Sequence, residues 1–157
     1  MMGFAEKLKI GLTSEQMVAK YYASKGWAVF PTFNMMPDGR GPRVIKNGVE
    51  YIAPDVQIVK DRVVKWVEVK TCSYTAFNIN GKFESVSLWI KQLDEYKKFN
   101  DDIGDVLICL VMLGERNTTS GIYCEDIKTM IALIDHIWEP DGKVYWKLGN
   151  LNRIADI

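Results

Sequence analysis

Polar and apolar residues alternate in two stretches between Pro54 and Lys70. A period of two is typical of half-buried β-strands, so the segment is predicted to form a hairpin with a tight turn at Lys60-Asp61. Side chains alternate between the two faces of a strand, so Glu68 and Lys70 should point to the same side, about 7 Å apart. If that side also faces Asp55, two carboxylates and an ammonium group converge on a small volume.

Apolar residues at helical spacing predict two helices. The first is expected to begin near Thr13, which forms a capping-box pattern with Gln16, and to end at Gly26. The second is expected from Ser85 to Phe99. An almost uninterrupted apolar run from Asp105 to Leu113 is typical of a central strand that is covered on both faces.

Shorter signals complete the pattern. They predict strands at 27–32, 121–124 and 143–148, a loop at 34–42, hairpin turns at Asn47-Gly48 and Asp141-Gly142, and a helix or a further strand at 125–134. This order of helix, strands, helix, strand and mixed tail predicts an α/β sandwich with a central mixed sheet flanked by helices. The length of 157 residues suits a single domain spanning 1–157.

Composition is that of an ordinary globular protein, with 48% hydrophobic and 25% charged residues. Twenty basic residues balance 20 acidic ones, which lowers the expectation of strong non-specific DNA binding but does not exclude a local basic groove. The three cysteines, Cys72, Cys109 and Cys124, share no CxxC spacing, so neither a disulfide framework nor a zinc site is expected.

The amino-terminal residues lack the long apolar run of a signal peptide. No stretch approaches the roughly 18 apolar residues of a membrane span. The sequence therefore predicts a cytoplasmic protein with no membrane partner.

Three carboxylates, Glu15, Asp55 and Glu68, are candidates for a metal site. Magnesium prefers hard oxygen ligands and is often held by only one or two carboxylates. Lys70 beside such a site could orient or deprotonate an attacking water. Alternatively, Asp55 only marks a turn, while Glu68 and Lys70 form a solvated pair on a strand face.

Each predicted helix carries a polar residue on its apolar face. Glu15 shares its face with Val18, Ala19 and Tyr22, and Gln92 lies among Leu88, Trp89, Tyr96 and Phe99. A buried polar group needs partners, and a nearby active site would supply them. For Gln92, a satisfied core glutamine is an equal alternative.

These residues resemble the PD-(D/E)XK nuclease superfamily. The resemblance covers most of residues 11–113: the helix with Glu15, the strand that starts at Pro54-Asp55, the Glu68-Val69-Lys70 strand, and the helix with Gln92 and Tyr96. Gln92 and Tyr96 resemble the QxxxY motif of exonuclease-like and resolvase-like members. The resemblance implies the restriction-endonuclease-like fold, in which residues 114–157 would complete the sheet and could supply a dimer surface.

The resemblance further implies a metal-dependent phosphodiesterase that acts on DNA and leaves a 5′-phosphate. Asp55, Glu68 and the Val69 backbone carbonyl would bind Mg²⁺, for which Mn²⁺ could substitute. Glu15 would bind a second metal or hold a metal-bound water, and Lys70 would assist the water. Gln92 and Tyr96 would support the site or touch the DNA backbone.

The chain has no room for a separate target-recognition domain, which argues against a sequence-specific restriction enzyme. Compact members of the superfamily are often homodimers that cut branched DNA, such as Holliday junction resolvases, so branched DNA or DNA ends, in repair, recombination or a phage life cycle, are the expected substrates. Resolvases are usually basic, however, and this chain is neutral, so a partner protein could deliver the DNA. Two alternatives remain: a non-catalytic DNA-binding or assembly module on the nuclease fold, and a generic α/β protein in which the motif is coincidental.

Further basic residues are candidate DNA contacts. Arg40 and Arg43 flank Gly41-Pro42 in a loop that could hold a phosphate backbone, and Lys82 follows the hairpin. Solvated surface positions are the alternative for all three. Trp138, Tyr145 and Trp146 could stack on bases, but core or dimer-surface positions are favoured.

Overall fold

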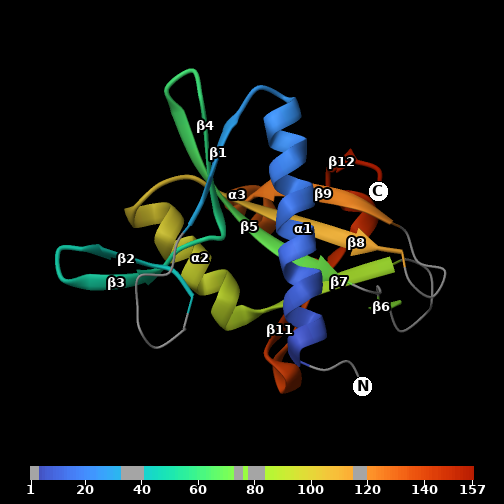
Figure 1. Ribbon diagram of the computed structural model, residues 1–157. Helices are drawn as coiled ribbons and strands as arrows, with labels where there is room; N and C mark the ends of the chain where they lie inside the picture. The colour runs from blue at the N-terminus through green and yellow to red at the C-terminus, as the bar shows by residue number, and fades with distance from the viewer. Residues whose placement is uncertain (1–3, 33–40, 73–75, 78–83, 115–119) are drawn as a thin grey trace.

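The computed structural model describes residues 4–32, 41–72, 76–77, 84–114 and 120–157 (Figure 1). A six-stranded mixed sheet forms the centre, and its strands in spatial order are β1 (Ala28–Pro31), β4 (Val56–Lys60), β5 (Val63–Cys72), β8 (Val106–Leu113), β9 (Ser120–Asp126) and β12 (Arg153–Ala155). β5 and β8 are parallel, whereas the other neighbouring strands of this sheet are antiparallel.

Two smaller sheets accompany it. One has the order β10 (His136–Trp138), β11 (Lys143–Lys147), β7 (Glu84–Trp89) and β6 (Ala76–Phe77), and the other is the hairpin of β2 (Arg43–Lys46) and β3 (Val49–Ile52). The helices are α1 (Phe4–Ser24), α2 (Ile90–Asp102) and α3 (Ile127–Ala132), with short 3₁₀ turns at Glu139–Asp141 and Leu148–Asn150.

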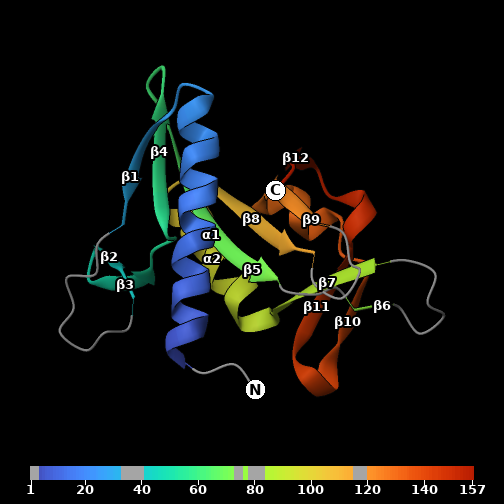
Figure 2. The same cartoon turned by 45° about the vertical axis from the view of Figure 1, so that its right-hand side comes forward.

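Helices cover both faces of the central sheet. On one face, Val18 and Tyr22 of α1 pack against a layer that includes Ile58 and Val67. On the other, α2, α3 and the β7–β11 sheet enclose a larger core around Ile108. Figure 2 shows α1 standing along the sheet and the β10–β11 hairpin projecting away from it. The predicted mixed sheet flanked by helices is confirmed.

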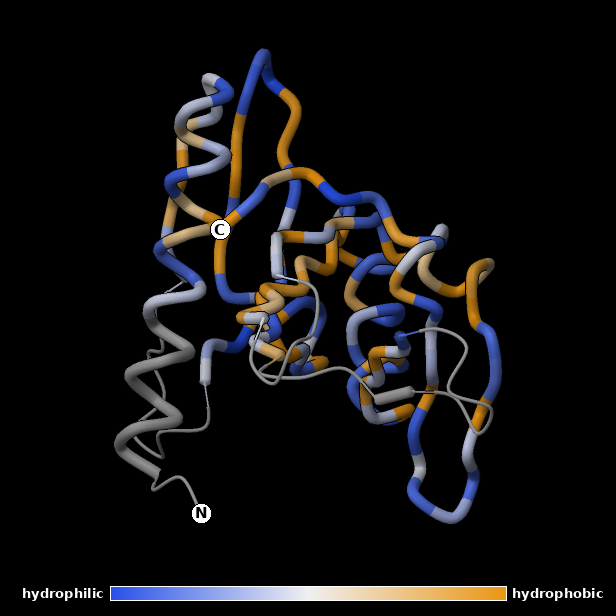
Figure 3. The backbone as a smooth tube through the Cα atoms, turned by 90° about the vertical axis from the view of Figure 1, so that its right-hand side faces the viewer, coloured by the Kyte–Doolittle hydropathy of each residue, from blue (hydrophilic) through white to orange (hydrophobic). Residues whose placement is uncertain are grey.

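β8 is the strand predicted from the longest apolar run, and it lies in the interior of the sheet between β5 and β9. Ile108 and Val111 are fully buried on its two faces. Hydrophobic positions accordingly follow the strands in Figure 3, while the tips of the β4–β5 and β10–β11 hairpins are hydrophilic. No helix among the described residues is long and apolar enough to cross a membrane.

Two predicted boundaries are wrong. α1 begins at Phe4 rather than near Thr13, so the capping-box pattern lies inside the helix, where the preceding turns already satisfy the backbone. Residues 85–89 form the end of strand β7, and α2 begins only at Ile90. Val86 and Leu88 alternate toward the core, and pairing with β11 satisfies the strand, so tertiary pairing overrides the helical pattern.

The hairpin turns follow backbone geometry. Asn47 and Gly48 both have positive φ angles, 52° and 76°, and join β2 to β3 as predicted. Between β4 and β5 the two turn residues are Asp61 and Arg62, with φ angles of 50° and 68°, because Lys60 still pairs with Val63. The predicted Lys60-Asp61 turn is therefore one residue too early. Within the segment predicted at 125–134 as a helix or a further strand, Ile127–Ala132 form the helix α3, whereas Glu125 and Asp126 are the end of β9.

Candidate functional site

Strand β5 brings Glu68 and Lys70 together, as their spacing predicts. Lys70 Nζ lies 2.5 Å from Glu68 Oε1. Glu68 is buried, with 4% of its surface exposed, whereas Lys70 is partly exposed. The pair thus sits at the edge of the interior, with the ammonium group on the outer side.

Asp55 joins this pair from the neighbouring strand. It directly precedes β4, whose first residue Val56 pairs with Val67, so Asp55 comes opposite Glu68. Its Oδ2 accepts a hydrogen bond of 2.8 Å from the backbone N–H of Val69. Burial raises the pKa of Asp55, while the Val69 hydrogen bond, the Lys70 charge and a hydrogen bond with Glu68 lower it by less.

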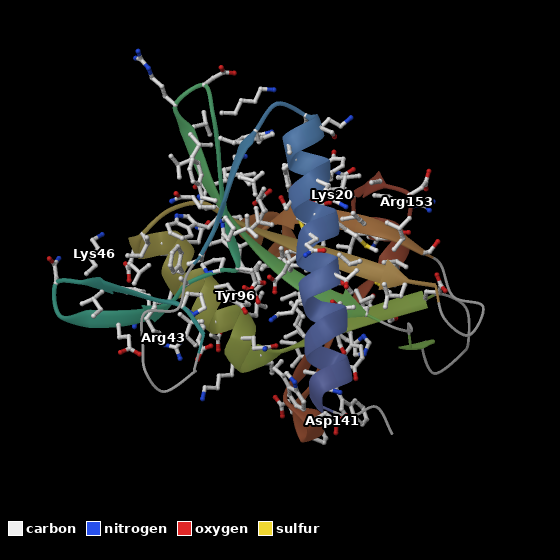
Figure 4. All side chains as sticks on the ribbon, viewed as in Figure 1. Lys20, Arg43, Lys46, Tyr96, Asp141 and Arg153 are labelled. Carbon is white, nitrogen blue, oxygen red and sulfur yellow. The ribbon has the colours of Figure 1, made fainter. Side chains whose placement is uncertain are left out.

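Helix α2 contributes Tyr96, which is buried (Figure 4). Its hydroxyl donates to Glu68 Oε1 at 2.5 Å, the same oxygen that Lys70 contacts. The Lys70 ammonium group also lies 5.5 Å from the centre of the Tyr96 ring, within reach of a cation–π interaction. Burial and the nearby Glu68 charge raise the pKa of Tyr96, which keeps its hydroxyl a donor.

Asp55 and Glu68 bring two carboxyl groups close together in a mostly buried position. Burial raises the pKa of Glu68 to about 7, the charge of Lys70 opposes this rise, and Asp55 adds to it. A carboxylate whose charged form is disfavoured in this way gains from a further cation. Perturbed carboxyl groups of this kind are typical of functional sites.

Glu15 reaches the same region from α1. It is partly buried on the face that carries Val18, and its pKa is raised by burial and by Asp55, and lowered by Lys70. The residue before it, Ser14, accepts a hydrogen bond of 2.7 Å from Thr71 of β5, which fixes this turn of α1 beside the cluster. The inward position expected for Glu15 is therefore observed.

Gln92 lies one helical turn before Tyr96 on α2 and is partly buried. It lines a hollow of about 240 Å³ together with Lys70. Both residues of the expected helical pair thus lie next to the cluster, Tyr96 by a hydrogen bond and Gln92 across a surface hollow. Leu88 and Trp89, which were expected on the same helix, belong to β7 instead.

The oxygen atoms present suit a hard cation. Asp55 and Glu68 share one side of the sheet, and the backbone carbonyl of Val69 belongs to the same strand segment. Within the described residues, no three His, Cys, Asp or Glu side chains gather closely enough to hold a metal ion. Two carboxylates and water are nevertheless a common set for Mg²⁺, so the donors fit this ion, with Glu15 outside the innermost group.

Most other candidates have different surroundings. Arg43 Nε pairs with Glu50 at 3.1 Å, and its Nη1 donates to the carbonyls of Gly41 and Pro42, so it stabilises the β2–β3 hairpin. Arg40 and Lys82 lie outside the described residues. Trp146 is fully buried and donates to the carbonyl of Met130, which makes it a core residue.

The sequence pattern missed two residues near the cluster. Trp89 and Lys143 line the same hollow as Lys70 and Gln92, and they pair across β7 and β11. The only signal in the sequence is the period of two over residues 84–89, a segment that was predicted mostly as helix. Trp89 and Lys143 come together only because β7 pairs with β11, which is distant in the sequence.

Among solved structures, the fold is similar to that of Hjc, a Holliday junction resolvase from the archaeal hyperthermophile Archaeoglobus fulgidus. The match has a TM-score of 0.59 and covers 92% of this chain and 91% of that chain, at 10% sequence identity. No protein-family model and no curated protein matches the sequence. At this identity the likeness establishes the fold, and it agrees with the restriction-endonuclease-like sandwich expected from the sequence.

Proposed function

We propose that this protein is a metal-dependent nuclease that hydrolyses phosphodiester bonds in branched DNA. The observation that carries the proposal is the convergence of Asp55, at the start of β4, with Glu68 and Lys70 of the neighbouring strand β5. The fold supports it, because the similar Hjc is a Holliday junction resolvase. The order of the four PD-(D/E)XK motifs along the chain supports it as well, and the QxxxY assignment of Gln92 and Tyr96 is part of the proposal.

Asp55, Glu68 and the Val69 carbonyl would hold Mg²⁺, and Mn²⁺ could substitute. When bound, the ion supplies Lewis-acid polarisation of the phosphodiester and neutralises charge on the oxygens. The raised pKa of Glu68 supports this assignment, because a buried carboxylate beside a second one is stabilised by an added cation.

The chain's own groups position the reactants. The Lys70 ammonium group, on the outer side of Glu68, would orient the attacking water and offset charge on the phosphoryl oxygens. The water oxygen would bond to phosphorus as the bond from phosphorus to the 3′ oxygen breaks. The attacking water gives up a proton and the leaving oxygen takes one up, so the products are a 5′-phosphate and a 3′-hydroxyl. Tyr96 holds the Glu68 carboxylate in place, while Gln92 borders the surface that the DNA backbone would cross. Glu15 would hold a water or a second ion at the rim.

A cleavage assay tests the proposal. Plasmid and four-way-junction DNA are incubated with Mg²⁺ and with the intact protein, Asp55→Asn or Lys70→Ala. Loss of proton-transfer or metal-binding groups should lower the cleavage rate by about 100-fold or more. Two matched controls lie in the same hairpin: Asp61→Asn, at the β4–β5 turn, and Lys65→Ala, between Val64 and Trp66 on β5.

Both controls should keep the intact rate. Asparagine suits position 61 because it tolerates the left-handed backbone found there. Unchanged cleavage by Asp55→Asn and Lys70→Ala would contradict the catalytic assignment. Binding of junction DNA without cleavage by the intact protein would instead favour the alternative, a non-catalytic DNA-binding or assembly module.

Assembly belongs to the same proposal. A junction offers two strands for symmetric cutting, so a homodimer would place one site on each. Sedimentation of the free protein and of its junction complex tests this, and two protomers per junction is the expected result. A partner protein that delivers the DNA stays a prediction, motivated by the neutral net charge.

A further inference from the structure

The hollow beside Lys70 extends over the outer face of the β7–β11 sheet. Its wall includes Lys70 and Gln92 on one side and Ser87, Trp89 and Lys143 on the other. A second hollow of about 730 Å³, between the start of α2 and the tip of the β10–β11 hairpin, shares Trp89 and Gln92 with it. Trp89 therefore stands at the boundary of two adjoining depressions, the first of which begins at the candidate catalytic cluster.

Strand register explains why Trp89 and Lys143 meet. Lys143 of β11 pairs with Trp89 of β7 on one side and with Trp138 of β10 on the other, so the three side chains share one face. The Lys143 ammonium group lies 4.8 Å from the centre of a Trp89 ring. Leu88, the preceding residue of β7, points into the core and is 7% exposed.

Trp89 is a large aromatic residue on the surface, and 51% of it is exposed. The backbone beneath it is fixed, because the N–H of Ile90, the first residue of α2, donates to the carbonyl of Gly142 at 2.9 Å. A large exposed aromatic surface on a fixed backbone at a hollow is suited to stacking on a flat ligand.

Charge differs between the two hollows. Among the described residues, the smaller one is lined by Lys70 and Lys143 and by no acidic side chain. The larger one combines Lys91 with Asp94 and Asp141, whose position at the hairpin tip is labelled in Figure 4. A phosphate group is therefore favoured in the smaller hollow, beside the Trp89 ring.

We infer that Trp89 and Lys143 form a subsite for an unpaired nucleotide next to the phosphate that is cleaved, an inference that rests on the proposed nuclease function. The Trp89 ring stacks on the base, and the Lys143 ammonium group contacts a flanking phosphate. Within a duplex both faces of a base are covered by its neighbours, so stacking requires a base that has left the helix, as at a fork or branch point.

Binding without metal isolates the subsite from catalysis. The probes are a fluorescein-labelled thymidine strand of about 20 nucleotides, longer than the roughly 4–16 nucleotides of typical single-strand sites, and a blunt duplex of equal length. Fluorescence anisotropy in EDTA compares the intact protein with Trp89→Ala, Trp89→Phe and Lys143→Ala. Trp138→Ala is the matched control, since Trp138 is 47% exposed on the same sheet face and lines neither hollow.

Trp89→Ala should weaken binding of the single strand about tenfold, the loss typical of one base–aromatic stack. Binding of the duplex should change less than twofold, Trp89→Phe should recover most of the single-strand affinity, and Trp138→Ala should behave as the intact protein. Lys143→Ala should weaken single-strand binding and reduce its dependence on salt, because a phosphate contact is lost. Melting curves verify that each variant is folded.

Equal single-strand affinities of the intact protein and Trp89→Ala would overturn the subsite. So would an equal loss in Trp138→Ala, or a change of oligomeric state in Trp89→Ala, which would make Trp89 a contact between copies. Binding and cleavage assays together distinguish the nucleotide subsite from the nuclease function. If binding depends on Trp89 but the intact protein does not cleave DNA, the subsite is supported and the nuclease function is refuted. If the intact protein cleaves DNA but Trp89→Ala does not change binding, the nuclease function is supported and the subsite is refuted.

Discussion

Replacing Tyr96 with phenylalanine removes a single hydroxyl group from the candidate site. The ring stays, so the packing of α2 against the sheet and the contact with the Lys70 ammonium group are kept. The lost interaction is the 2.5 Å hydrogen bond to Glu68 Oε1, between two buried residues that are each 4% exposed. The substitution therefore tests the hydrogen bond almost alone.

The expected magnitude follows from this setting. Hydrogen bonds to charged groups contribute about 1.5–3 kcal/mol to stability. Lys70 still contacts the same oxygen, so the loss should lie toward the lower end, about 2 kcal/mol. For a chain of this length, each kcal/mol lowers Tm by about 2–4 °C, which gives a decrease of about 4–8 °C.

Urea denaturation and thermal melting of the metal-free protein measure the effect. Tyr145→Phe is the control, because Tyr145 stacks on His136 through its ring and no hydrogen bond of its hydroxyl occurs among the described residues. The control should stay within about 0.5 kcal/mol of the intact protein. A Tm change below about 1 °C in Tyr96→Phe, or an equal decrease in the control, would refute the reasoning.

Three further substitutions probe the scaffold, each by urea denaturation. Ile108→Val, in the middle of β8 where the side chain is fully buried, should destabilise by about 0.5–1.5 kcal/mol, and a neutral result would contradict its tight packing. Gly48→Ala should lower the free energy of unfolding by about 1–2 kcal/mol through backbone strain alone, since φ is +76° and a β-carbon there would meet no atom within 4 Å. Gly149→Ala is the control, because a β-carbon at Gly149 also meets no atom within 4 Å, and it should lower the stability less. Asp126→Ala removes the cap of α3 and should cost about 1 kcal/mol at neutral pH. Hydrogen bonds from Thr129 lower the pKa of Asp126 below 3.8. The stabilisation by the Asp126 cap is therefore present at higher pH and is lost as the pH falls through the lowered pKa. A stability difference between the intact protein and Asp126→Ala that persists in stronger acid would contradict this reasoning.

Much of the candidate site could be predicted because it depends on local geometry. The period of two fixes Glu68 and Lys70 on one face of β5, and a short turn brings Asp55 to the same face. The position of Asp55 opposite Glu68 depends on the observed turn at Asp61-Arg62, which lies one residue later than predicted. The inward direction of Glu15 follows from helical spacing within α1. These relations need only a few neighbouring residues, so the sequence contains them.

The remaining features depend on distant pairings. Residues 85–89 have apolar positions that fit a strand as well as the start of a helix, and only their pairing with β11 decides between the two. The short bond from Tyr96 to Glu68 requires α2 to dock on the sheet at one rotation. The hollow lined by Trp89 and Lys143 requires both the β7–β11 pairing and the docking of α2, so it cannot be predicted from local sequence.

The parallel pairing of β5 with β8 has a consequence for the order of folding. Parallel neighbours need a crossover, and here the intervening chain, which includes β7 and α2, must close before β8 can lie beside β5. Bringing β5 and β8 together costs chain entropy before any contact between the two strands stabilises the pair, so this pairing forms late and slowly. Glu68 lies on β5, where the crossover begins, and its hydrogen-bond partner Tyr96 lies within the crossover, on α2. A nascent or partly folded chain therefore carries Asp55 and Glu68 but not the buried surroundings that raise the pKa of Glu68, so we expect the proposed nuclease activity to arise only with the completed fold.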